Sequence, residues 1–146
     1  YVGGETTCAA ALAAHAATPF THILSAATNA GRNAVPRIAA GLDASPVTDV
    51  LEVEGEDTFV RPMYAGSALA RVRNSDAVKC LTVRPTAFDK AEASGGSAAV
   101  SELAFGADGR SPAFVSADVK QSDRPDLTAA NVVIAGGRGM KNGENL

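Results

Sequence analysis

The sequence predicts an α/β domain followed by the beginning of a second one. Three observations support this prediction: a helix–strand–helix order up to Leu42, four short strand-like runs between Val47 and Arg84, and a late apolar run that leads into a glycine-rich turn. The order helix, strand, helix is typical of a parallel α/β unit. A chain of 146 residues is long enough to bury a core of ordinary domain size.

The first part of the chain predicts two helices around one strand. Residues Glu5–Ala17 are rich in alanine, which is the best helix former. Residues 21–26 read as a short buried strand, and Thr28–Asn33 as a polar turn. The second helix is indicated by four apolar residues spaced i, i+3, i+4 and i+7, namely Val35, Ile38, Ala39 and Leu42. We expect Pro36 in the first turn of this helix, where its missing N–H is harmless.

The middle of the chain predicts strands. The four strand-like runs are Val47–Val53, Thr58–Tyr64, Ala68–Arg73 and Val78–Arg84. The connections between them are short, and short connections favour antiparallel neighbours.

The last third of the chain predicts a domain boundary. From Ala91 to Asp118 the residues are small and polar, as in surface loops. Residues 121–127 form a polar crossing that contains Pro125. We therefore assign residues 1–120 to the first domain, 121–130 to the link, and 131–146 to the start of the second domain. The second domain would open with a buried strand, Asn131–Ala135, and then turn at the glycines.

Composition and charge exclude several classes of function. The net charge of −3, from 13 basic and 16 acidic residues, argues against nucleic-acid binding. No apolar stretch is long enough to cross a bilayer, so we expect no direct membrane insertion. Cys8 and Cys80 lie far apart, without a CxxC pair or metal-ligand spacing, and weakly favour a reducing compartment.

The glycine-rich turn is the most functional local feature of the sequence. A buried strand, a glycine-rich turn and a helix together bring backbone N–H groups to a phosphate or cofactor in α/β domains. Arg138 in that turn could pair with an anionic or carbonyl group of a ligand. The third glycine of GxGxxG is missing, because position 142 is Asn142. From spacing alone, a ligand-binding turn and a plain βα turn with an exposed arginine are both open.

Other candidates favour structural roles. His15 and His22 have no acidic or thiol neighbours that would complete a metal set, so we expect neither to be a ligand. Arg61, Arg84 and Asp89 could form an acid/base or anion site. Arginines on strands, however, more often pair with neighbouring carboxylates or lie at an interface. We name no catalytic residue.

Four collinear stretches carry a resemblance to a known family. They are Thr21–Ile23 with Gly31–Ala40, Asp57–Ala68, Val83–Asp89 with Gly95–Ser97, and Ser122–Thr128 with Gly136–Asn145. Together, in order and at family spacing, they make the chain similar to the electron-transfer-flavoprotein alpha family over nearly its whole length. Because the first strands of the family domain and the later flavin-binding segments are missing, we expect the chain to be a fragment.

This resemblance implies a fold and a site. The first domain would be an incomplete three-layer α/β/α unit with a mixed sheet, similar to a nucleotide-binding fold of the adenine-nucleotide-hydrolase type, and mainly a scaffold. The second would be an FAD-binding domain, of which the chain holds only the first strand and turn. Arg138 matches the family arginine that contacts FAD.

The resemblance also implies a function. The parent protein would be an electron carrier, not a substrate-converting enzyme, that forms a heterodimer with a beta subunit. It would take electrons from acyl-CoA dehydrogenases in fatty-acid β-oxidation and pass them to a membrane-bound ubiquinone oxidoreductase. The compartment would be the mitochondrial matrix, or alternatively the bacterial cytoplasm. A non-redox nucleotide-binding or purely structural α/β domain remains the alternative, because fold does not determine function.

Overall fold

The computed structural model describes residues 3–106, 112–119, 124–127 and 130–145. It divides into two compact units, Tyr1–Phe114 and Val115–Leu146. All regular strands and both α-helices of the described residues lie in the first unit. The predicted boundary at 121–130 remains a prediction, and residues 121–123, 128 and 129 of it lie outside the described residues.

A parallel sheet forms the centre of the first unit. Its strands are β1 (His22–Ala26), β6 (Lys79–Val83) and β2 (Pro46–Val50), in the order β1-β6-β2. The register pairs Leu24 with Leu81, and Val47 also pairs with Leu81 from the other side. β6 is central and buried because its run Cys80-Leu81-Thr82 meets the helices on one face and the second sheet on the other.

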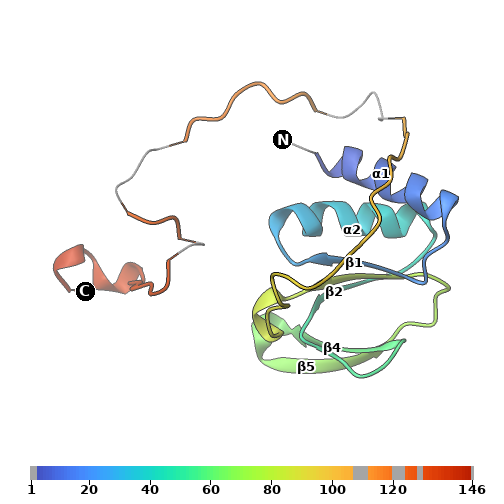
Figure 1. Ribbon diagram of the computed structural model, residues 1–146. Coiled ribbons are helices and arrows are strands. Elements are labelled where there is room, and N and C mark those ends of the chain that lie inside the picture. The colour runs from blue at the N-terminus through green and yellow to red at the C-terminus, as the bar shows by residue number, and fades with distance from the viewer. Residues whose placement is uncertain (1–2, 107–111, 120–123, 128–129, 146) are drawn as a thin grey trace. The chain divides into compact units, whose positions relative to one another are not determined.

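One face of this sheet is covered by the helix α2 (Asn29–Gly41), and a second helix, α1 (Gly4–Ala17), packs against α2 (Figure 1). The first core lies between them and β6 and contains Ala34, Val35, Ile38, Ala39 and Cys80. α2 begins earlier than predicted because the hydroxyl of Thr28 caps it, accepting a hydrogen bond from the Gly31 N–H at 3.3 Å. Pro36 therefore stands inside the helix and not in its first turn.

An antiparallel sheet covers the other face (Figure 1). Its strands are β3 (Glu52–Val53), β4 (Thr58–Met63) and β5 (Ala68–Arg73), in that order. β4 and β5 are joined by a 3₁₀ turn, η1 (Tyr64–Gly66). The second core lies between the sheets, where Val47, Val50, Phe59 and Leu81 are buried.

The α/β prediction, with parallel and antiparallel strands, is confirmed. Two details differ. The described strands form two separate sheets, and in the described residues the third layer is the second sheet and not helices. The connection between β5 and β6 is short, yet these strands belong to different sheets. The run Cys80-Leu81-Thr82 of β6 is buried on both faces, and this burial outweighs the preference of a short loop for antiparallel pairing.

Residue 51 marks a further difference from the prediction. The run from Val47 to Val53 was predicted as one strand, but it divides into β2 and β3 because the chain passes from one sheet to the other. At the crossing, the Leu51 N–H donates to the Val60 carbonyl at 2.8 Å. The strand-like run Val47–Val53 therefore contributes a strand to each of the two sheets.

The segment after β6 contains little regular structure. A 3₁₀ turn, η2 (Pro85–Ala87), follows Arg84, and residues 88–106 form no helix or strand, as the composition predicted. In the second unit, Asn131–Ala135 pairs with no strand of the described chain, and Val132 and Ile134 are 80% and 82% exposed. The predicted buried strand is therefore absent here, because a strand needs neighbours that accept its hydrogen bonds and cover its faces. No described helix has the length and apolar character needed to span a membrane.

Candidate functional site

The glycine-rich turn forms a shallow hollow of about 300 Å³ in the second unit. Its lining residues are Gly136, Gly137, Arg138, Met140, Lys141, Asn142 and Gly143. Arg138 opens a 3₁₀ turn, η3 (Arg138–Met140), and a further one, η4 (Gly143–Asn145), follows. The sequence therefore placed Arg138 on a turn correctly, although the strand that was expected before it is missing.

Two observations bear on whether this turn fits a cofactor. Beyond their chain neighbours, no described atom lies within 4 Å of the position that a Cβ would take on Gly137 or Gly139. The Arg138 side chain makes no hydrogen bond or ion pair with any described residue. A bare backbone next to a cation suits the approach of a phosphate or a polar ring edge. The hollow is large enough for part of FAD only, because cofactor sites enclose most of the ligand surface.

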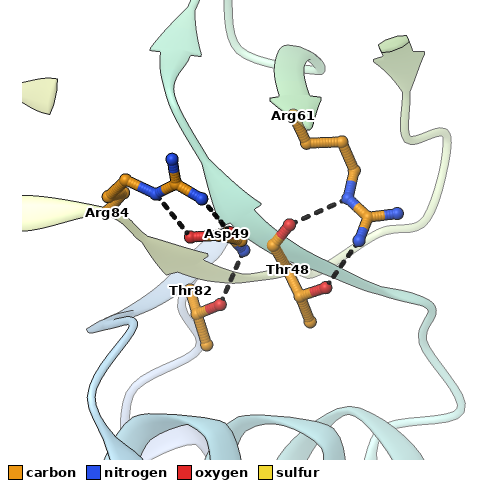
Figure 2. A network of polar contacts seen from close by, with 5 residues as sticks. All are labelled: Thr48, Asp49, Arg61, Thr82 and Arg84. Carbon is orange, nitrogen blue, oxygen red and sulfur yellow. Dashed lines mark hydrogen bonds and ion pairs between the residues drawn. The ribbon is translucent and has the colours of Figure 1, made fainter. Parts of the chain in front are cut away.

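A second cluster lies at the carboxyl ends of the parallel strands in the first unit. Figure 2 shows it: Arg61 from β4 and Arg84 just after β6 flank Thr48 and Asp49 of β2. Arg61 donates from Nε to the Thr48 carbonyl at 2.8 Å and from Nη2 to the Thr48 hydroxyl at 3.0 Å. Arg84 donates from Nε and Nη2 to the two carboxylate oxygens of Asp49, at 3.1 Å and 2.5 Å. Ligands of open α/β sheets bind at this edge.

A bulge in β2 directs these two side chains. The pairing of β2 with β6 shifts register between Val47 and Val50, and Asp49 has a φ of 63°. In a regular strand, residues three apart point to opposite faces, yet Val47 and Val50 are both buried in the second core. The bulge therefore displaces Thr48 and Asp49 from the core. The Asp49 N–H is satisfied by the buried Thr82 hydroxyl at 2.9 Å.

Three arginines act on the carboxylate of Asp49. The hydrogen bond from Arg84 lowers the pKa of Asp49 below its ordinary value, and partial desolvation opposes this effect. The charges of Arg84, Arg32 and Arg61 lower that pKa further. Asp49 is therefore ionised at neutral pH and is surrounded by more positive charge than it can neutralise.

The sequence named Arg61 and Arg84 but missed Thr48 and Asp49. Arg84 pairs with a neighbouring carboxylate, as was expected of strand arginines. Asp89 takes no part in this cluster and is exposed. An available signal for the bulge was Asp49 itself, because aspartate is depleted in strand interiors.

The two histidines have structural contacts. His15 Nδ1 accepts a hydrogen bond from the Phe20 N–H at 3.1 Å. His22 Nε2 lies 2.7 Å from the Glu56 carbonyl and connects β1 to the antiparallel sheet. Among the described residues, no group of three His, Cys, Asp or Glu side chains could hold a metal ion. Burial raises the pKa of the Cys80 thiol, which disfavours the nucleophilic thiolate form.

Comparison with known proteins gives consistent matches. The family described as "Electron transfer flavoprotein domain" matches residues 4–108. The chain is 50% identical over 127 residues to "Electron transfer flavoprotein subunit alpha" of Pseudomonas aeruginosa, which covers 87% of the chain and 41% of that protein. It is 47% identical over 134 residues to the mitochondrial alpha subunit of Dictyostelium discoideum, covering 86% of the chain and 38% of that protein. The chain thus spans about two fifths of the length of these relatives.

Proposed function

Because this chain belongs to the electron transfer flavoprotein family, we propose that it is part of an alpha subunit that carries electrons. Proteins of this family are electron carriers and do not convert a substrate. The observation that supports this proposal is the match of residues 4–108 to the family, together with the 50% identity to a relative named as an alpha subunit.

We propose FAD as the cofactor and Arg138 as one of its contacts. FAD would supply the reversible uptake of electrons, and the protein would hold it and tune its potential. Arg138 supports this proposal because its side chain has no hydrogen-bond or ion-pair partner among the described residues and lies beside glycine backbone. A guanidinium favours negative charge on a bound group and offers a planar set of donors.

The partners proposed here follow from the family. A subunit named alpha implies a beta subunit, so the parent protein would be a heterodimer. The family resemblance adds acyl-CoA dehydrogenases as electron donors and a ubiquinone oxidoreductase as acceptor, in fatty-acid β-oxidation. Because both mitochondrial and bacterial relatives match, the compartment would be the mitochondrial matrix or the bacterial cytoplasm.

The proposal is tested by the visible absorbance of the full-length protein purified with its beta subunit. We expect a yellow protein with the absorbance bands of oxidised flavin, which bleach on reduction with an acyl-CoA dehydrogenase and its substrate. A colourless protein without flavin would instead support the non-redox nucleotide-binding or structural alternative.

A companion experiment uses residues 1–146 alone. Titration of FAD into this chain should leave flavin fluorescence nearly unchanged, because a hollow of about 300 Å³ encloses only part of FAD. Tight binding would show that the cofactor site lies within these residues, and it would move the site away from the segments that follow them in the family.

A further inference from the structure

The cluster around Asp49 belongs to a larger positively charged surface. The strands β1, β6 and β2 run parallel, and their carboxyl ends meet at one edge of the sheet. Arg84 follows β6 directly, and Arg32 lies in the first turn of α2, which follows β1. Arg61 reaches the same place from β4 through Thr48.

This surface has an excess of positive charge over negative charge. Elsewhere among the described residues of the first unit, arginines pair with one carboxylate each: Arg37 with Glu5, Arg71 with Glu54 and Arg73 with Asp57. Here Asp49 is the single described carboxylate in an ion pair, and it pairs with Arg84. Arg32 and Arg61 form no ion pair with a described residue, yet both are close enough to act on the charge of Asp49. Arg84 alone contacts the Asp49 carboxylate, and the charges of Arg32 and Arg61 add to the positive charge around it, in a chain whose net charge is −3.

Two of the arginines, Arg61 and Arg84, are held in place before any partner binds. Arg61 is fixed by two hydrogen bonds to Thr48 and a contact of Nη1 with the Met63 sulfur at 3.3 Å. A side chain that is ordered in advance loses less conformational entropy on binding. The acceptors of the Arg61 hydrogen bonds, on Thr48 and Met63, are neutral, so they leave the positive charge of Arg61 available to an incoming anion.

An exposed aromatic side chain follows β4, the strand that carries Arg61. Tyr64 follows Met63 and is 82% exposed. Tyr64, Ala65 and Gly66 all have positive φ angles, of 50°, 55° and 94°. Such strained backbone gathers at binding sites, where surrounding structure maintains it. Tyrosine and arginine are also the residue types that most often anchor protein interfaces.

The chemistry of this surface points to a protein partner rather than a small molecule. The α2 N-terminus offers less to a free phosphate, because the Thr28 hydroxyl already accepts from the Gly31 N–H. A broad surface with excess arginine charge and an aromatic anchor suits a segment that carries several carboxylates.

We propose that this surface, defined by Arg32, Arg61, Arg84 and Tyr64 and called the arginine edge, docks an acidic segment of a partner protein. The inference does not depend on flavin. It would stand if the protein bound no FAD, and it can fail while the protein still carries electrons.

The test measures binding of a fluorescent decaglutamate peptide to the full-length protein by fluorescence anisotropy at low salt. We expect binding that weakens as salt rises. Arg32→Gln with Arg61→Gln should weaken binding about 5- to 10-fold, since exposed charge pairs each contribute a factor of a few. Arg71→Gln with Arg73→Gln is the matched control, because it removes the same charge from arginines that already have carboxylate partners. This control should change binding less than about 2-fold.

Two further variants keep the test decisive if the loss of Arg61 disturbs folding. Arg32→Gln alone removes charge from an exposed residue without an ion pair to a described residue, and it should weaken binding about 2- to 5-fold. Arg61→Lys keeps the charge and should bind nearly as the unchanged protein does.

Three outcomes would overturn the proposal. One is the absence of measurable peptide binding, and another is an equal loss in the arginine-edge and control variants. The third is displacement of the peptide by inorganic phosphate at matched ionic strength, which would identify a small-anion site instead.

Discussion

Asp49 and Arg84 form a bidentate ion pair that joins two parallel strands at their carboxyl ends. Asp49 lies in the bulge of β2, and Arg84 directly follows β6. Both carboxylate oxygens accept hydrogen bonds from the guanidinium, and the Arg84 N–H donates to the Val50 carbonyl at 2.9 Å. The pair therefore stabilises the point at which the chain leaves the parallel sheet and enters the antiparallel one.

The Asp49–Arg84 ion pair predicts that the unfolding free energy of the protein falls in acid. Because the native pKa of Asp49 is lowered, the carboxylate stabilises the fold above its unfolded pKa of about 3.9. This contribution is lost as the pH falls through the lower native pKa. In Asp49→Asn the difference in unfolding free energy from the unchanged protein should be largest at neutral pH and should vanish in acid. Urea titrations at several pH values measure it, and a constant difference would contradict the role given to the ion pair.

Replacement of Gly31 by alanine should cause a severe packing defect. A Cβ on Gly31 would lie 2.0 Å from the Ala26 carbonyl oxygen, where α2 passes over the end of β1. Since backbone cannot move as a flexible side chain can, Gly31→Ala should cost at least about 2 kcal/mol of unfolding free energy. Gly55→Ala is the matched control, because nothing lies within 4 Å of its Cβ position. Thermal or urea unfolding compares them, and equal stability of the two variants would refute the close approach.

Replacement of Ala65 by glycine should stabilise the folded protein. Its φ of 55° is in the left-handed region, which costs an L-residue about 1–2 kcal/mol but costs glycine little. Ala65→Gly should therefore raise the unfolding free energy by up to about 1 kcal/mol, after the greater freedom of glycine in the unfolded chain is counted. Gly66→Ala, at a φ of 94°, should lower it. Loss of stability in Ala65→Gly would show that the turn conformation is different.

The domain boundary predicts a pattern of proteolysis. Limited digestion of the full-length protein should cut within residues 91–127 before it cuts within 21–84. The described residues 88–106 form no helix or strand, whereas β4 and the central β6 are paired along their length. Mass spectrometry of the first fragments locates the cuts. Early cleavage between Val47 and Arg84 would place the boundary elsewhere.

Arg138 predicts a change in flavin retention or potential in the full-length heterodimer. A cation beside the flavin favours its more negatively charged reduced form, so Arg138→Ala should weaken FAD retention, lower the reduction potential, or both. A charge-assisted contact of about 1–3 kcal/mol corresponds to tens of millivolts, up to about 100 mV, for a one-electron step. Bound-flavin content and redox titration measure the effect.

Arg138→Lys is the companion variant for this experiment. It keeps the charge but loses the planar set of donors, so it should preserve the potential better than it preserves affinity. If Arg138→Ala holds flavin normally and its potential is unshifted, Arg138 is only a surface residue on a turn. The family assignment would survive that result.

The sequence alone determined the elements whose signals are local. The alanine content of α1 and the apolar spacing of α2 predicted both helices. The run 21–26 and the four strand-like runs predicted the strands, except that Val47–Val53 divides into β2 and β3. Local sequence also supplied the family, because collinear motifs identify relatives without any knowledge of packing. The predicted strand Asn131–Ala135 is not formed, because a strand depends on more than local sequence. Its apolar residues match a buried strand, but a strand exists only beside partner strands, and the described chain provides none.

Tertiary structure decided which strands pair and which side chains meet. A short loop joins β5 to β6, yet the burial of β6 on both faces places it between β1 and β2. The bulge that turns Thr48 and Asp49 toward Arg61 and Arg84 arises because Val47 and Val50 must both reach one core while the chain changes sheets. Periodicity describes one segment at a time, and packing depends on contacts between segments that are distant in the chain. The arginine edge, drawn from α2, β4, η1 and the residue after β6, therefore exists only in the folded protein.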